Sequence, residues 1–144
     1  MKSDLSWRYS NFLLRVSLGL FLFLWGVDKI MAPADTLRIF EHFYKIQIGT
    51  AASTALGIAE MLLGIAIILG RWRTLSYGLG LFFHMISTLS SWRQLLDPWG
   101  TIWNQGKNSH LFLASIPVLA AFIVLFMNRG DGRFTFNCSA GLKK

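Results

Sequence analysis

Four long apolar segments constrain the fold of this chain more than any other feature. They cover residues 12–30, 51–69, 75–92 and 109–127. Each is close to the ~20 residues that a helix needs to cross a hydrocarbon core of ~30 Å. Because hydrocarbon offers no hydrogen-bond partners, segments of this length cross it as helices. We therefore predict an all-α integral membrane protein, with four transmembrane helices in a single domain over residues 1–144.

The composition supports a membrane protein and excludes several other classes. Of the 144 residues, 53% are hydrophobic and 15% are charged, whereas about a quarter are charged in a soluble domain. Intrinsic disorder requires low hydrophobicity, so this composition excludes a disordered chain. A nucleic-acid partner requires a basic polar face, so the net charge of +7 does not indicate one. The single cysteine, Cys138, cannot form an intramolecular disulfide.

The distribution of basic residues predicts the orientation. Nine of the 14 Lys and Arg residues fall in the N-terminal segment, the second connection and the C-terminal tail. By the positive-inside rule, both termini are expected in the cytoplasm, with the excess charge near anionic headgroups. The six tryptophans fall near segment ends, which is typical of an aromatic belt. A cleavable signal peptide ending at Ala32-Pro33-Ala34 is an alternative, although Asp28 and Lys29 interrupt its apolar run.

Two connections have readable local structure. Residues 35–49 predict a short helix with Asp35 as its N-cap, lying on the bilayer surface. A loop that docks a partner or gates a substrate is the alternative. Residues 97–100, Asp-Pro-Trp-Gly, predict a turn held at the interface by tryptophans.

Each predicted helix carries a stripe of small or polar residues at spacings of three and four, which places them on one face. Lipid provides no hydrophobic drive for helix association, so small residues allow close packing and polar residues turn inward. We therefore expect a compact four-helix bundle with these stripes inside. The stripes are Arg15, Gly19, Leu22, Gly26 and Lys29; Ser53, Gly57, Glu60 and Gly64; Tyr77, Gly80, His84, Ser87 and Ser91; and His110, Ala114, Pro117 and Ala121.

Arg15, Glu60 and His84 are ionisable residues inside the predicted spans, and such residues are candidates for a functional site. Arg15 could pair with Glu60 or extend to the headgroups. Glu60 could form a structural ion pair, or bind a proton or ligand. His84 could make an interhelical hydrogen bond or ligate a haem or metal.

These three residues are the catalytic candidates. His42 and His110 alone are too few ligands to predict a metal site. The predicted ligand-binding set is Arg15, Gly19, Gly26, Lys29, Gly57, Glu60, Gly64 and His84.

Several motifs resemble the DoxX family of small four-span bacterial membrane proteins. They are LRVSLG at 14–19 followed by GVDKI at 26–30, GIAEMLLG at 57–64, and GDGRFTF at 130–136. The resemblance implies a four-helix bundle in the bacterial cytoplasmic (inner) membrane. Some members resemble the small subunit of thiosulfate:quinone oxidoreductase, and relatives act beside thiol or disulfide redox partners.

We therefore favour an accessory subunit of a membrane redox system that contacts quinone and a membrane or periplasmic partner protein. Glu60 or His84 would handle protons, and the electrons would come from the partner. The alternatives are a small solute carrier or channel that uses Glu60 as its coupling group, or an assembly scaffold without activity. The sequence leaves open the ligand, any activity of the chain alone, and whether it forms a homo-oligomer.

Overall fold

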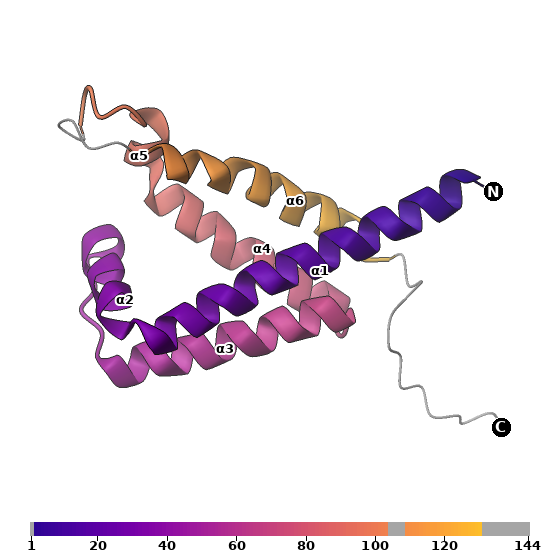
Figure 1. Ribbon diagram of the computed structural model, residues 1–144, viewed down its shortest axis with the longest axis horizontal. Helices are drawn as coiled ribbons and strands as arrows, with labels where there is room; N and C mark the ends of the chain where they lie inside the picture. Colours follow the sequence, from indigo (N-terminus) through magenta and orange to yellow (C-terminus); the bar gives the residue numbers. More distant parts are fainter. Residues whose placement is uncertain (1, 104–108, 131–144) are drawn as a thin grey trace.

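The computed structural model describes residues 2–103 and 109–130, which are entirely helices and their connections. The predicted glycine-rich tail after residue 130 lies outside this part. The elements, in chain order, are α1 (Lys2–Met31), α2 (Pro33–Ile39), the π-helical turn η1 (Phe40–Tyr44), α3 (Thr50–Leu69), α4 (Arg73–Ser90), α5 (Trp92–Leu96), the 3-10 helix η2 (His110–Ala114) and α6 (Ser115–Met127) (Figure 1).

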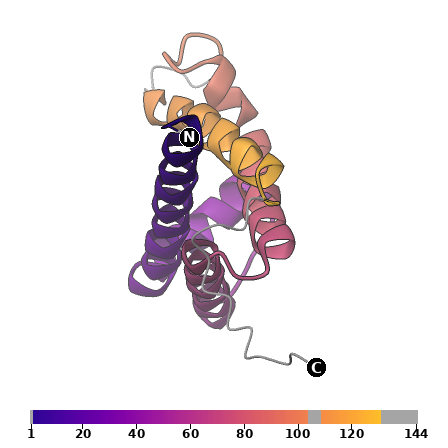
Figure 2. The same ribbon diagram turned by 90° about the vertical axis from the view of Figure 1, so that its right-hand side faces the viewer.

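Four long rods, α1, α3, α4 and η2–α6, run between the same two ends of the molecule (Figure 1). We call one end the turn end, because it holds the connection between α3 and α4. The start of α1 and the end of α6 lie there too. The other, the loop end, holds α2 and α5. α1 packs mainly against α3, and α4 mainly against α6, so the molecule consists of two helix pairs (Figure 2).

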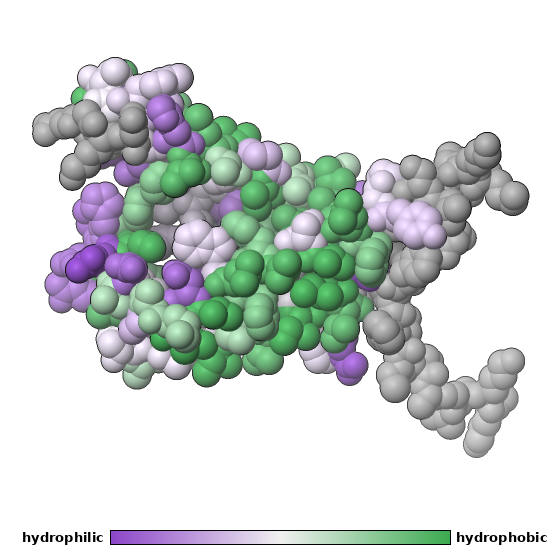
Figure 3. Space-filling view, in the orientation of Figure 1, coloured by the Kyte–Doolittle hydropathy of each residue, from purple (hydrophilic) through white to green (hydrophobic). Residues whose placement is uncertain are grey.

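Three of these rods are long and apolar enough to cross a membrane. They comprise Tyr9–Met31, Thr50–Leu69 and His110–Met127. Most of their residues are exposed, and apolar residues cover the middle of the molecule (Figure 3). Because a soluble protein this small does not expose so large an apolar surface, the chain is a multi-pass membrane protein. α4 is not among the three, so the fourth crossing and the orientation stay predictions.

All six tryptophans are exposed, and each exposes at least 44% of its surface. Trp7 and Trp72 lie toward the turn end, whereas Trp92, Trp99 and Trp103 lie at the loop end. Indole rings prefer the headgroup region over the hydrocarbon core. Their placement fits two interfacial belts.

The α1–α3 contact brings two backbones together at paired glycines. A Cβ built on Gly26 would lie 2.6 Å from the carbonyl oxygen of Gly57, and one built on Gly57 would lie 2.6 Å from that of Gly26. Gly19 and Gly64 form a second reciprocal pair, with 2.6 and 2.5 Å for the same distances. The predicted stripes of the first two spans therefore face each other. With no side chains between them, the helices gain close van der Waals contact.

The α4–α6 pair packs the ring of Phe122 in α6 against Gly80 in α4. A Cβ on Gly80 would lie 2.8 Å from Cε1 of Phe122, so the absence of a side chain makes room for this ring. Around it the buried core gathers residues from all four rods. It comprises Leu18, Leu22, Ile67, Tyr77, Phe122 and Leu125.

The stripe predicted for the fourth span is wrong. His110, Ala114 and Pro117 are exposed and Ala121 is half-buried, whereas Phe122 and Leu125 are buried. α6 packs the rings of Phe122 and Phe126 against Gly80 and Gly78 of α4. The residues of α6 that face inward are therefore large, not small. In the third span, Ser87 is also exposed, and the adjacent Thr88 is buried instead.

The connection after α1 forms the predicted short helix, but it begins earlier. Pro33 occupies the first turn of α2, where its missing N–H breaks no hydrogen bond. Asp35 lies within that first turn, and Ala32 is the N-cap, so the predicted capping role of Asp35 is wrong. The carboxylate instead contacts Arg38 at 3.4 Å on the surface.

A buried carboxylate organises the connection after α5. Asp97 is 1% exposed. It accepts hydrogen bonds from the backbone N–H groups of Thr101, Ile102 and Trp103 at 2.7, 2.9 and 2.7 Å, and from the Thr101 hydroxyl at 3.1 Å. The predicted turn at residues 97–100 is confirmed by the bond from the N–H of Gly100 to the carbonyl of Asp97.

Replacing Gly57 by alanine should separate α1 from α3. The new methyl would meet the backbone of Gly26, which cannot yield as a flexible side chain can. We expect a loss of about 1–3 kcal/mol in stability, the usual cost of overpacking. Thermal unfolding in mild detergent measures it. The matched control is Gly49→Ala, where a Cβ would meet nothing within 4 Å. Equal unfolding temperatures for the two variants would contradict the close contact.

Candidate functional site

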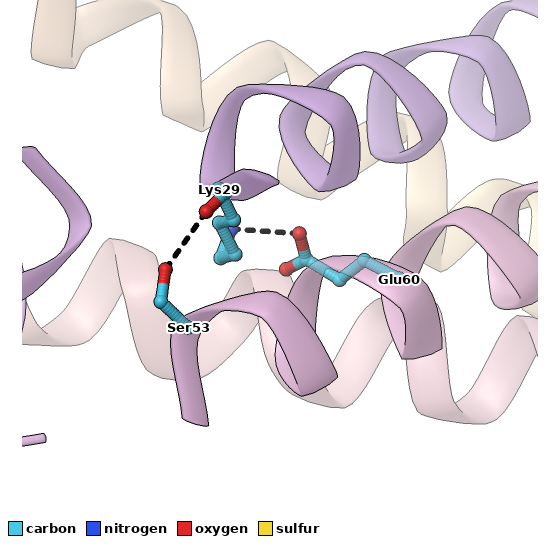
Figure 4. Close-up of polar contacts among 3 residues, drawn as sticks. All are labelled: Lys29, Ser53 and Glu60. Carbon is cyan, nitrogen blue, oxygen red and sulfur yellow. Dashed lines mark hydrogen bonds and ion pairs between the residues drawn. The ribbon is translucent and has the colours of Figure 1, made fainter. Parts of the chain in front are cut away.

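The charged residues of the α1–α3 seam form one ion pair. Nζ of Lys29 donates to Oε2 of Glu60 at 2.7 Å, and the two side chains are 15% and 22% exposed (Figure 4). The hydroxyl of Ser53 donates to the backbone carbonyl of Lys29 at 2.9 Å. The ion pair and the Ser53 hydrogen bond therefore link α1 to α3 next to the Gly26–Gly57 pair.

The helix register explains this pairing. The two glycine pairs show that α1 and α3 are antiparallel, with residue 57 level with residue 26 and residue 64 level with residue 19. Side chains on a helix tilt toward its N-terminus. Lys29 therefore extends back along α1 toward the level of Glu60, and Glu60 extends back along α3 toward Lys29.

The same geometry excludes the Arg15–Glu60 pair, which was one of the two alternatives that the sequence left open for Arg15. In this register Glu60 is level with residue 23, so Arg15 lies roughly 12 Å away along the axis. Its side chain also tilts away from Glu60.

Arg15 has different surroundings. It is buried, at 6% exposure, toward the turn end. Its guanidinium interacts electrostatically with Tyr77 of α4 and lies 5.6 Å from the ring centre of Phe12. The alternative of a side chain extending to the headgroups is not what the structure shows, because a snorkelling arginine exposes its guanidinium.

His84 makes the interhelical hydrogen bond that was one of its two interpretations. Its Nε2 lies 3.1 Å from the carbonyl oxygen of Ser115 in α6. A carbonyl only accepts, so Nε2 carries the hydrogen. The rings of Phe21 and Phe122 flank the imidazole, each at 5.6 Å between centroids. His84 thus joins α4 to α6 in the core, and a ligand-binding role for it stays a prediction.

The predicted ligand-binding set therefore divides into three places. Lys29, Glu60, Gly26 and Gly57 lie together, and Gly19 and Gly64 meet farther along the same seam. Arg15 lies toward the turn end, and His84 lies between helices in the core. Within residues 2–103 and 109–130, no group of three or more His, Cys, Asp or Glu side chains could hold a metal ion.

Two aromatic residues belong to the site although the sequence did not single them out for it. The ring of Trp25 lies 5.6 Å from Nζ of Lys29, within range of a cation–π contact. Phe21 contacts Trp25 edge-on at 6.3 Å and also contacts His84. The spacing of four residues from 21 to 25 to 29 places all three on one face of α1, which is the signal that could have identified them.

Removing one member of the ion pair should destabilise the protein. Lys29→Met leaves the Glu60 carboxylate in an apolar seam, and we expect a loss of about 2–3 kcal/mol, typical of an uncompensated charge in a membrane span. Thermal unfolding of the purified protein measures it.

The exchanged double variant, Lys29→Glu with Glu60→Lys, keeps opposite charges in the seam and is the test of pairing. It should recover more than half of the lost stability. Recovery of none would contradict the direct pair.

Comparison with known families gives a match to the DoxX family model over residues 10–92, which is more than half of the chain. The match covers α1 from residue 10 onward and all of α3 and α4, including Lys29, Glu60 and all four seam glycines. Searches of curated proteins and of solved structures give no significant match. Together with the glycine-lined seam and the apolar helices, this match shows that the chain belongs to the DoxX family.

Proposed function

We propose that this chain is an accessory membrane subunit of a redox system, and that it holds a quinone headgroup beside the Lys29–Glu60 pair. The carrying observation is the state of the Lys29 ammonium. It has three N–H donors, and only one hydrogen bond from it, to Glu60, forms among the described residues. The side chain is also partly exposed, so a ligand at the edge of the seam can reach it.

The surrounding residues suit a quinone. A quinone carbonyl is an acceptor that an ammonium donor can polarise. Trp25, 44% exposed, offers an aromatic face next to that donor, and aromatic rings stack on one another. The exposed apolar residues of α1 continue alongside and suit an isoprenoid tail, including Leu20 and Leu24.

Reduction of a quinone to a quinol takes two electrons and two protons. In this proposal the electrons come from a partner protein. Glu60 transfers protons, because a carboxylate at the seam edge can exchange them with water. Lys29 donates a hydrogen bond to the carbonyl oxygen and so fixes the headgroup beside Glu60.

Binding of a short-chain ubiquinone analogue, followed by tryptophan quenching, tests this proposal. Lys29→Met should weaken binding about tenfold or more, the loss expected for a charge-assisted hydrogen bond. The matched control is Lys45→Met, at an exposed lysine after η1. The exchanged Lys29→Glu and Glu60→Lys variant should remain folded but bind poorly. If that variant binds as tightly as the native chain, the pair is structural only and the proposal is wrong.

We further propose that α4 is the fourth crossing, which places both termini in the cytoplasm and the chain in the inner membrane. The support is the division of polarity around α4. Its polar residues Ser76, Tyr77, His84 and Thr88 are buried within the bundle. Apart from Thr74 and Ser87, its exposed uncharged residues are apolar, namely Leu75, Leu79, Phe82, Phe83, Met85, Ile86 and Leu89. Average hydropathy combines these two faces and hides the apolar one.

Cysteine accessibility in intact cells tests this topology. In a Cys138→Ser background, single cysteines at Gly49 and Thr101 should react with a membrane-impermeant maleimide, because both lie at the loop end. A cysteine at Arg71, in the α3–α4 turn, should react only after the cells are opened. Equal labelling of the Arg71 and Thr101 positions in intact cells would show that α4 does not cross.

A further inference from the structure

The turn end carries a shallow, open hollow where α3, α4 and α6 meet. Its lining comes from the α3–α4 turn, the first residues of α4 and the residue two after α6. The lining residues are Gly70, Trp72, Arg73, Thr74, Leu75 and Arg129. None of them is acidic and two are arginines.

Among residues 2–103 and 109–130, the ion pairs join Lys29 to Glu60 and Arg38 to Asp35, and neither Arg73 nor Arg129 takes part in one. No acidic residue occurs between Glu60 and Asp97, nor between Asp97 and Asp131. Nη1 of Arg73 is buried and has no hydrogen-bond acceptor among the described residues. Arg129 uses Nη1 on the carbonyl of Phe126 at 3.1 Å and lies 4.5 Å from the ring centre of Phe126, which leaves its other donors available. Within the part of the chain that the structure describes, the hollow therefore presents two positive charges without an ion-pair partner.

The backbone of the turn holds this arrangement in an uncommon conformation. Gly70 and Trp72 are both left-handed, with φ of 66° and 48°. For tryptophan this conformation is strained, because its Cβ crowds the backbone in the left-handed region. The buried hydroxyl of Ser76 donates to the carbonyls of Arg71 and Trp72, at 2.9 and 3.2 Å, and so maintains it. The result keeps Trp72 on the surface, beside the first turn of α4, whose N–H groups no side chain caps.

The borders of the hollow point to a lipid rather than to a free anion. Trp72 and Leu75, which line it, expose 67% and 61% of their surfaces. An indole prefers the headgroup level, and the apolar residues adjoin the ends of the long helices. A phosphate between the two arginines would leave its acyl chains against this apolar border.

We propose that this hollow binds the phosphate of an anionic phospholipid, with Arg73 and Arg129 as its ligands and Trp72 and Leu75 against the glycerol and acyl chains. The site lies at the opposite end of the bundle from the Lys29–Glu60 pair. It is therefore independent of the quinone proposal.

Titration of the detergent-purified protein with dioleoyl phosphatidylglycerol, followed by native mass spectrometry, tests the site. Arg73→Gln and Arg129→Gln should each lower the apparent affinity about fivefold. The matched control is Arg71→Gln. Arg71 is an exposed arginine of the same turn that stacks on Trp72 at 4.8 Å but does not line the hollow. This variant removes the same net charge and should leave the affinity within about twofold.

Two further arms identify the source of the phosphate. Dioleoyl phosphatidylcholine should bind more weakly than dioleoyl phosphatidylglycerol. Excess inorganic phosphate should not displace the bound phosphatidylglycerol. Equal binding of the two lipids would overturn the proposal, as would an equal effect of all three arginine variants. Complete displacement by inorganic phosphate would show a free-anion site instead. Because Arg129 lies after the end of α6 and is exposed, Arg129→Gln gives a valid readout even if Arg73→Gln fails to fold.

Discussion

The contact on which the rest of this structure depends is the backbone approach of α1 and α3 at two glycine pairs. With oxygen atoms where side chains would otherwise stand, the helices can be neither rotated nor shifted without a clash. That fixed register brings the Lys29 ammonium to the Glu60 carboxylate. It also leads the Ser53 hydroxyl to the backbone of Lys29. A charge pair in an apolar medium is favourable only with good geometry, and the glycine seam supplies that geometry.

The sequence predicted the α1–α3 seam because glycines spaced along one helix face indicate where two helix backbones can approach closely. The spacing of small residues along the helix was enough to predict the inward faces of α1 and α3, because the residues in contact there are small on both helices. The same spacing failed for α6, because α4 and α6 pack a large ring into a notch and a bulky residue then marks the inner face. The partner of Glu60 was missed for another reason. The register of α1 against α3 and the tilt of side chains toward the helix N-terminus decide which cation reaches the carboxylate, and the sequence of one helix does not contain that register.

Charge is distributed unevenly along the bundle, and each part has a different role. Lys29 and Glu60 neutralise each other within the seam. Asp97 accepts hydrogen bonds from three backbone N–H groups at the loop end, and it thereby shapes the connection after α5. Arg73 and Arg129, beside the α3–α4 turn, form no ion pair within the described residues, so their charge is not balanced inside the bundle as that of Lys29 is.

The order of the elements adds a consequence for how the protein is made. α1 emerges from the ribosome before α3, with α2 and η1 between them. Until α3 arrives, α1 has an open glycine groove and a lysine ammonium without its carboxylate. α1 is therefore poorly suited to the bilayer on its own. It becomes stable there only when α3, which carries the matching glycines and Glu60, has been synthesised. Insertion of this protein should accordingly proceed by retaining α1 near the insertion machinery and releasing it together with α3 as one unit.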